Sequence, residues 1–177
     1  RTMLDDAGVE IASLMISGLK VFEHDPAQHA ANLDSLRNLF AFSADLGFKE
    51  NIIVNTMGGK IEDWDAHRYL YAERVADWAK VAAECGGVFA CEGHVGGTIN
   101  SSERELWLLK QVNHPALKVN FDYSHFELVD EPLQDAIDRL ASYAVGTHVK
   151  DSTGHPPNFR FLLPGEGAVD YADYIRR

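Results

Sequence analysis

Five apolar runs of strand length recur along the chain, and an amphipathic stretch separates each run from the next. Gly, Asn or Asp bounds the runs, and most are apolar along their whole length, as expected for strands covered on both faces. They lie at Val9–Ser17, Asn51–Thr56, Val88–Glu92, Leu117–Asp122 and Val145–Val149. Strands that alternate with helices form parallel sheets, so this order predicts an α/β fold.

The stretches between these runs carry helix boundary signals. Asp25 followed by Pro26 predicts the start of a helix, and Gly47 predicts its end. The other predicted helices are one around Trp64–Glu84, one opened by a capping box of Ser102 and Glu105, one that begins near Pro132 and one that opens at Asp170.

The number of units is smaller than a closed barrel requires. A closed (β/α)8 barrel takes roughly 250 residues, whereas this sequence has 177 residues and five predicted strands. We therefore expect residues 1–177 to form a single, partial domain, an incomplete (β/α)8 barrel with about five βα units, from a longer protein.

Composition narrows the class of partner and the compartment. Sixteen Lys and Arg against 27 Asp and Glu give a formal net charge of −11, which disfavours binding to nucleic acid or to anionic membranes. The two cysteines, Cys85 and Cys91, suggest neither a disulfide framework nor a thiolate metal site. No apolar run reaches the length of a membrane span. We expect a soluble cytoplasmic protein.

Three polar side chains stand at the ends of successive predicted strands. Glu92, Asp122 and His148 are separated by 30 and 26 residues, which is about one βα unit each. This spacing places them at the same rim of the sheet, where barrel enzymes keep their chemistry. Taken singly, such an Asp is more often a helix cap and such a His more often a core residue.

Together the three groups suggest a metal site. Two carboxylates buried beside an imidazole need a compensating charge, which a divalent cation supplies. Oxygen and nitrogen ligands without thiolate suit Mn²⁺, Mg²⁺ or Co²⁺, with Zn²⁺ as an alternative. The sequence does not choose among these metals.

Other side chains near the strand ends are candidate substrate contacts. The period of two along a strand puts His94 on the face of Glu92 and Lys150 on the face of His148. Arg160, in a predicted loop at His155–Leu163, is a further candidate for an anionic substrate group. The simpler interpretations are an ion pair of Lys150 with Asp151 or a neighbouring acid, and a solvated Arg160.

The motifs E-G-H, D-Y-S-H, H-V-K-D and L-P-G-E-G, in this order, resemble those of the xylose isomerase-like TIM barrels, a family of sugar phosphate isomerases and epimerases. The resemblance implies that the chain spans strands three to seven of that barrel. It also implies metal ligands at Glu92, Asp122 and His148, with a fourth, a glutamate, expected beyond Arg177. His125, in the D-x-x-H pattern, resembles a contact to a substrate hydroxyl.

The resemblance implies an activity as well. It suggests isomerisation or epimerisation of a small sugar or sugar phosphate, in which a base abstracts a proton and an enediolate forms. Glu92 would be both a metal ligand and a catalytic base.

Several alternatives remain open at this point. A metal-dependent lyase, such as a dehydratase of a keto-polyol, would use the same residues. A hydrolase that resembles endonuclease IV would need additional histidines, which the strand ends at Ser17–Leu19 and Asn55–Met57 lack. The trio could also be a relic in a non-catalytic protein. Because an unclosed sheet exposes two edges, a homo-oligomer is a further expectation.

Overall fold

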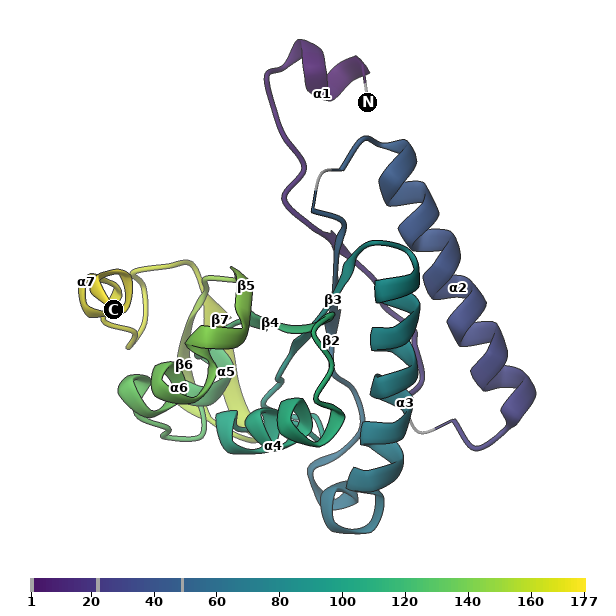
Figure 1. Ribbon diagram of the computed structural model, residues 1–177. Helices are drawn as coiled ribbons and strands as arrows, with labels where there is room; N and C mark the ends of the chain where they lie inside the picture. Colours follow the sequence, from purple (N-terminus) through teal and green to yellow (C-terminus); the bar gives the residue numbers. More distant parts are fainter. Residues whose placement is uncertain (1, 22, 49) are drawn as a thin grey trace.

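Five parallel strands form one sheet in the computed structural model, which describes residues 2–21, 23–48 and 50–177 (Figure 1). Each strand pairs with the next one along the chain, so the sheet order follows the sequence. The strands are β1 (Leu14–Met15), β2 (Ile52–Thr56), β3 (Val88–Glu92), β4 (Leu117–Phe121) and β5 (Ala144–Thr147). This half-barrel of alternating strands and helices confirms the predicted fold class.

Helices connect the strands and pack against one another in chain order. Figure 1 shows α2 (Pro26–Asp45) and α3 (Trp64–Glu84) side by side against the sheet. The remaining helices are α1 (Thr2–Asp6), α4 (Ser102–Val112), α5 (Tyr123–Glu127), α6 (Leu133–Leu140) and α7 (Tyr171–Arg176), with 3₁₀ turns η1 (Ile61–Asp63) and η2 (Ala141–Tyr143). Among the described residues, no helix is both long and apolar enough to cross a bilayer.

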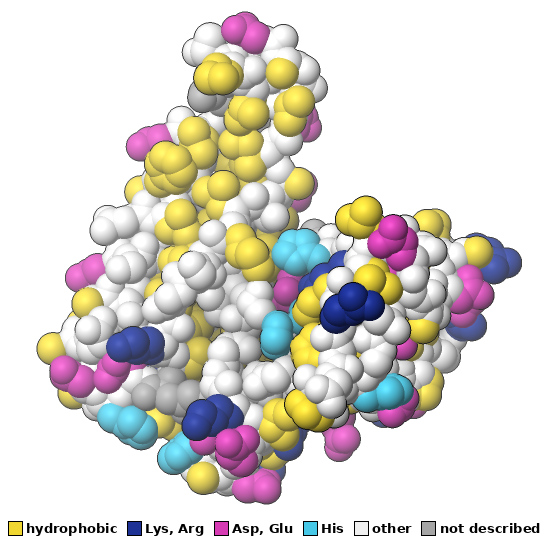
Figure 2. Space-filling model, turned by 180° about the vertical axis from the view of Figure 1, so that it is seen from behind, with side chains coloured by type: hydrophobic (Ala, Val, Ile, Leu, Met, Phe, Trp, Pro, Cys, Tyr) yellow, Lys and Arg dark blue, Asp and Glu magenta, His cyan; other side chains and the backbone are white. Residues whose placement is uncertain are grey.

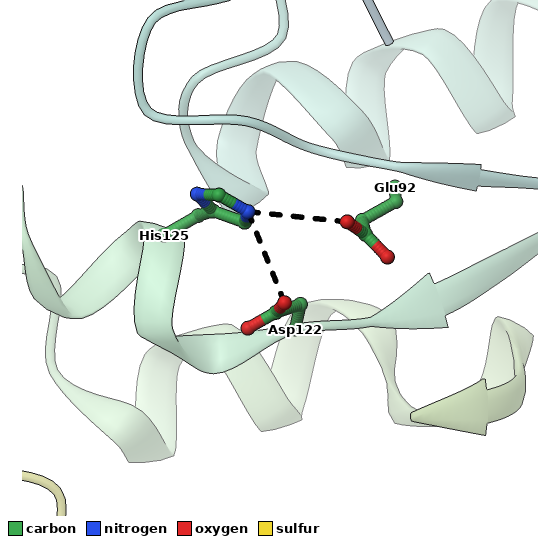
Figure 3. Close-up of side chains that lie close together, drawn as sticks. All are labelled: Glu92, Asp122 and His125. Carbon is green, nitrogen blue, oxygen red and sulfur yellow. Dashed lines mark ion pairs between the residues drawn. The ribbon is translucent and has the colours of Figure 1, made fainter. Parts of the chain in front are cut away.

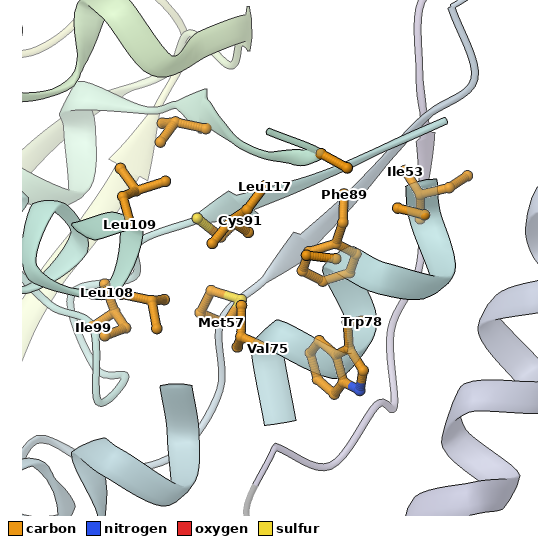
Figure 4. Close-up of a cluster of buried hydrophobic side chains, with 14 of the residues drawn as sticks. Ile53, Met57, Val75, Trp78, Phe89, Cys91, Ile99, Leu108, Leu109 and Leu117 are labelled. Carbon is orange, nitrogen blue, oxygen red and sulfur yellow. The ribbon is translucent and has the colours of Figure 1, made fainter. Parts of the chain in front are cut away.

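The main hydrophobic core lies between the sheet and the helices α3 and α4 (Figure 4). Trp78 of α3 and Phe89 of β3 are fully buried and meet edge to face, with ring centroids 5.2 Å apart. Cys91, two residues after Phe89, faces the same core. Glu92 is the next residue after Cys91 and therefore points to the opposite face of β3, which is also buried at this position.

Four of the five predicted strands have different bounds in the structure, and β2, expected from Asn51, begins at Ile52. The strand expected at Val9–Ser17 pairs with β2 only at Leu14–Met15, because it lies at the edge of the described sheet. The strand expected at Leu117–Asp122 ends one residue earlier, since Asp122 caps α5. The strand expected at Val145–Val149 is shifted to β5, where the ladder with β4 has an irregularity between Val119 and Asn120.

The predicted capping box of the third helix was also displaced. Ser101, one residue before the expected cap, accepts a hydrogen bond from the Arg104 amide. Ser102 is already helical, and its side chain instead contacts Glu131 and Arg139. Glu105 therefore does not take part in a capping box, and its side chain is almost completely buried.

The loop predicted at His155–Leu163 is a β-hairpin. Strands β6 (Asp151–His155) and β7 (Asn158–Leu162) are antiparallel and form a separate two-stranded sheet between β5 and α7. The missed signal is the alternation of Phe159, Arg160 and Phe161, which has the period of a strand. The hairpin matters because β7 reaches the strand ends described next.

Candidate metal centre

Glu92 is the last residue of β3 and is 2% exposed. Its carboxylate is held by neighbours on both sides: Asn120 of β4 donates to Oε2 at 2.6 Å, and Thr56 of β2 donates to Oε1 at 3.3 Å. His148 Nδ1 also lies 2.5 Å from Oε2. Parallel strands place these side chains at one rim, and the contacts fix the orientation of the carboxylate.

Asp122 follows β4 directly and is the N-cap of α5. Its Oδ1 accepts hydrogen bonds from the amide and the hydroxyl of Ser124, at 3.1 and 2.6 Å. Its Oδ2 accepts one from the ammonium of Lys150. The residue is 2% exposed. Asp122 is thus both a helix cap and a residue of the rim.

His125, three residues later on α5, completes a compact cluster with the two carboxylates (Figure 3). Its Nε2 lies 3.9 Å from Glu92 Oε1 and 3.8 Å from Asp122 Oδ2. One ligand atom from each of these three buried residues lies within 4.8 Å of the others. The structure therefore groups His125 with both carboxylates, whereas the close contact of His148 is to Glu92.

The environment of His125 keeps its imidazole neutral. Burial is the main cause that lowers its pKa to about 2, and the positive charge of Lys150 adds to the effect. Burial and the charge of Lys150 also lower the pKa of His94, whose ring centroid is 4.3 Å from that of His125. Neutral imidazoles are the form that coordinates metals.

His148 lies on the open side of the cluster. It follows β5, its amide donates to the Phe121 carbonyl at 3.2 Å, and its side chain is 39% exposed. Its Nδ1 nevertheless contacts Oε2 of Glu92. Figure 2 shows histidine and basic side chains gathered where the two lobes of the molecule meet, and hydrophobic side chains spread along the larger lobe.

Lys150 and Arg160 have different surroundings. Lys150 Nζ contacts Asp122 and lies 3.1 Å from His125 Nε2, so this lysine pairs with a neighbouring acid and not with Asp151. Asp151 instead accepts hydrogen bonds from backbone amides. Arg160 is exposed on β7 opposite Thr153, on the hairpin and away from the clustered side chains described above.

Sequence reasoning did not single out several residues of the site. Asn120 and Thr56 orient Glu92, and Phe161 of β7 packs on His125 with ring centroids 5.1 Å apart. Asn120 could have been found from the period of two, because it shares a face of β4 with Asp122. Phe161 could not, because its position depends on the fold of the hairpin.

The donor set is suitable for a divalent cation. Two buried carboxylates and neutral imidazoles offer oxygen and nitrogen ligands, and the described part of the cluster contains no thiolate. Lys150 offsets only one of the two negative charges, so a cation would complete the neutralisation of the site. Glu92, Asp122 and either His125 or His148 are the residues that could hold it.

A family model described as "Xylose isomerase-like TIM barrel" matches residues 1–177. A search of curated proteins found no match. Solved structures share the fold. The probable 3-DHS dehydratase involved in petrobactin synthesis from Bacillus anthracis has a TM-score of 0.83 and 21% identity, over 99% of this chain and 68% of that one.

Two further solved structures bear on the chemistry. The 3-keto-D-glucoside 4-epimerase of E. coli has a TM-score of 0.78 and 14% identity, over 99% of this chain and 69% of that one. A Mycobacterium smegmatis protein in complex with magnesium has a TM-score of 0.73 and 20% identity, over 99% and 64%. The chain thus spans about two thirds of the length of these three proteins.

Proposed function

This chain belongs to the xylose isomerase-like TIM barrel family, and from that premise we propose that it is a metal-dependent isomerase or epimerase of a small sugar or sugar phosphate. The observation that carries the proposal is the cluster at the strand ends. Glu92 and Asp122 are buried, lie beside neutral imidazoles and come from adjacent parallel strands. An epimerase among the similar structures supports the same class of reaction.

Each residue has a proposed role. Glu92, Asp122 and His148 would hold the cation, and His125 is a second candidate for the nitrogen ligand. A bound divalent cation would act as a Lewis acid toward substrate oxygens and stabilise developing enediolate charge. Glu92 would remove the proton next to the substrate carbonyl or hydroxyl. Asn120 would keep its carboxylate in the required orientation.

His94, His125 and Lys150 surround the same space and would bind the substrate. The rings of His94 and His125 lie 4.3 Å apart and are tilted by 46°, and Lys150 supplies the one ammonium in direct contact with the cluster among the described residues. Arg160 is proposed only as a contact for an anionic group that extends toward the hairpin. We propose that the substrate is a small molecule and that the protein forms a homo-oligomer.

We propose Mn²⁺, Mg²⁺ or Co²⁺ as the metal, with Zn²⁺ as an alternative; the magnesium-bound structure supports this class of ion. We also propose that the protein works in the cytoplasm in carbohydrate metabolism. The two cysteines support this compartment, because Cys85 and Cys91 are free thiols.

Calorimetric titration with Mn²⁺ tests the metal site. The wild-type chain should bind saturably, and Glu92→Gln or Asp122→Asn should abolish the binding. The exposed Asp138→Asn on α6 is the matched control, which should bind as the wild type does. Absence of saturable binding, or unchanged binding in Glu92→Gln, would refute the proposal.

A lyase acting on a keto-polyol is the second candidate function. It is favoured by the dehydratase among the similar structures and would use the same ligands and base. Mass spectrometry after incubation with Mn²⁺ and a panel of ketoses, aldoses and keto-polyols separates the two activities. An isomer keeps the mass of its substrate, whereas a dehydratase product is lighter by one water.

A further inference from the structure

The ring of Phe161 covers the ammonium group of Lys150 at the edge of the cluster. Lys150 Nζ lies 4.8 Å from the ring centroid, in the range of a cation–π contact. The same nitrogen binds Asp122 Oδ2 and lies 3.1 Å from His125 Nε2. The cation is therefore held from one side by the polar cluster and from the other by an aromatic ring.

The hairpin fixes the position of that ring. Phe161 stands opposite Ser152 in the β6–β7 ladder, and the Ser152 hydroxyl donates to Glu127 of α5. The Phe161 ring also meets His125 edge to face, at 5.1 Å and 84°. The contacts tie β7 to the same short helix that Asp122 caps, so the ring and the carboxylate are positioned by one local unit.

We propose that Phe161 is a positioning residue, which holds the ammonium of Lys150 over Oδ2 of Asp122. Its effect on the reaction rests on the proposed function, because Lys150 acts there as a substrate contact. The aromatic quadrupole attracts the cation, and the ring excludes water from one side of it. A leucine would preserve apolar contact without this attraction, whereas a tyrosine would preserve both.

Nuclear magnetic resonance of the chain labelled with ¹³C at the ε carbon of lysine tests the contact directly. A ring current should shift the Lys150 signal, assigned by its loss in Lys150→Arg, upfield of the other lysine signals. Phe161→Leu should remove this shift, and Phe161→Tyr should retain it. Phe42→Leu, an exposed phenylalanine on α2, is the control and should leave the signal in place. A wild-type Lys150 signal among the others would overturn the proposal.

Binding of Mn²⁺ then tests whether Phe161 acts through Lys150. Removing the ammonium beside Asp122 in Lys150→Met should tighten Mn²⁺ binding by about tenfold, because a like charge is lost. Phe161→Leu should tighten it less, by about two- to threefold, and should have no effect in the Lys150→Met background. An equal effect in both backgrounds would contradict the positioning role.

The two measurements keep the two proposals separate. If no variant binds Mn²⁺, the proposed metal-dependent function fails, and the lysine signals still decide whether Phe161 holds Lys150. If Mn²⁺ binds and Phe161→Leu moves neither the signal nor the affinity, the positioning role fails and the proposed function stands.

Discussion

The two sides of the site differ in how firmly the chain holds them. On the side of β3 and β4, Glu92 and Asp122 are each 2% exposed, and side chains or amides occupy their oxygens. On the side of β5, every strand residue is exposed, and the side chain of His148 is 39% exposed. Within the described residues, β5 pairs along one edge only, whereas β3 and β4 pair along both. The carboxylates are thus held within the core, whereas the groups that follow β5 are more exposed and are held mainly by their contacts to the carboxylates.

The largest expected effect concerns stability. Phe89→Ala on β3 should lower the free energy of unfolding by about 3–5 kcal/mol, because it leaves a cavity against Trp78. Val145→Ala on β5 should change it by less than about 0.5 kcal/mol, because this side chain is partly exposed. Urea denaturation of both variants measures the difference. Equal losses would mean that β5 is packed as firmly as β3.

The second effect concerns the nitrogen ligand of the metal. His148→Ala should weaken Mn²⁺ binding by on the order of 100-fold, and His125→Ala by only about tenfold, if His148 is the ligand and His125 a neighbour. Calorimetric titration measures both affinities. The reverse order would identify His125, which lies close to Asp122, as the ligand. The metal would then lie on the side of β3 and β4.

The third effect concerns Glu105, a buried residue of α4. Burial raises the pKa of the Glu105 carboxyl to about 8, and the negative charge of Glu92 adds to the effect. The folded state therefore favours the neutral acid. The stability that this group contributes is fully present below its ordinary pKa of about 4.5 and is lost as the pH rises toward 8.

Glu105→Gln should remove that loss. The variant should unfold like the wild type near pH 4 and should be more stable near pH 8, by on the order of 2 kcal/mol. Thermal unfolding across this pH range measures the difference, with the exposed Glu103→Gln on the same helix as the control. A constant difference between wild type and variant at all pH values would contradict a neutral buried acid.

The smallest effect concerns Asp151, whose side chain holds the loop that follows the hairpin. Burial alone would raise the pKa of Asp151, but hydrogen bonds from the amides of Val169, Gly167, Ser152 and Gly165 lower it overall. Its contribution to stability is therefore present above its ordinary pKa of 3.8 and is lost as the pH falls through the lower folded value.

Asp151→Asn should weaken these bonds and cost about 1.5 kcal/mol. Amide hydrogen exchange should rise at Gly165 and Val169, whereas Thr153→Ala, an exposed change on the same hairpin, should leave it unchanged. Unaltered exchange in Asp151→Asn would show that other contacts hold this loop.

Periodicity explains which parts of the fold were predictable. The strands β2, β3 and β4 are buried on both faces and are therefore mostly apolar. Such apolar runs can be located in the sequence within a residue or two. β1 and β5 lie at the edges, where the extent of a strand depends on its partner and not on its composition. The hairpin was missed because its strands are largely exposed and lack a continuous apolar run.

The sequence by itself determined that Glu92, Asp122 and His148 stand at one rim, because strand ends spaced by one βα unit meet there in any parallel sheet. Only the tertiary structure decided that His148 contacts Glu92 whereas His125 lies close to both carboxylates, because these distances depend on the short helix α5 and on the register of β5. It also decided that Lys150 binds Asp122 beneath Phe161 rather than Asp151. Contacts between side chains distant in sequence are fixed by packing, and local patterns carry no signal for them.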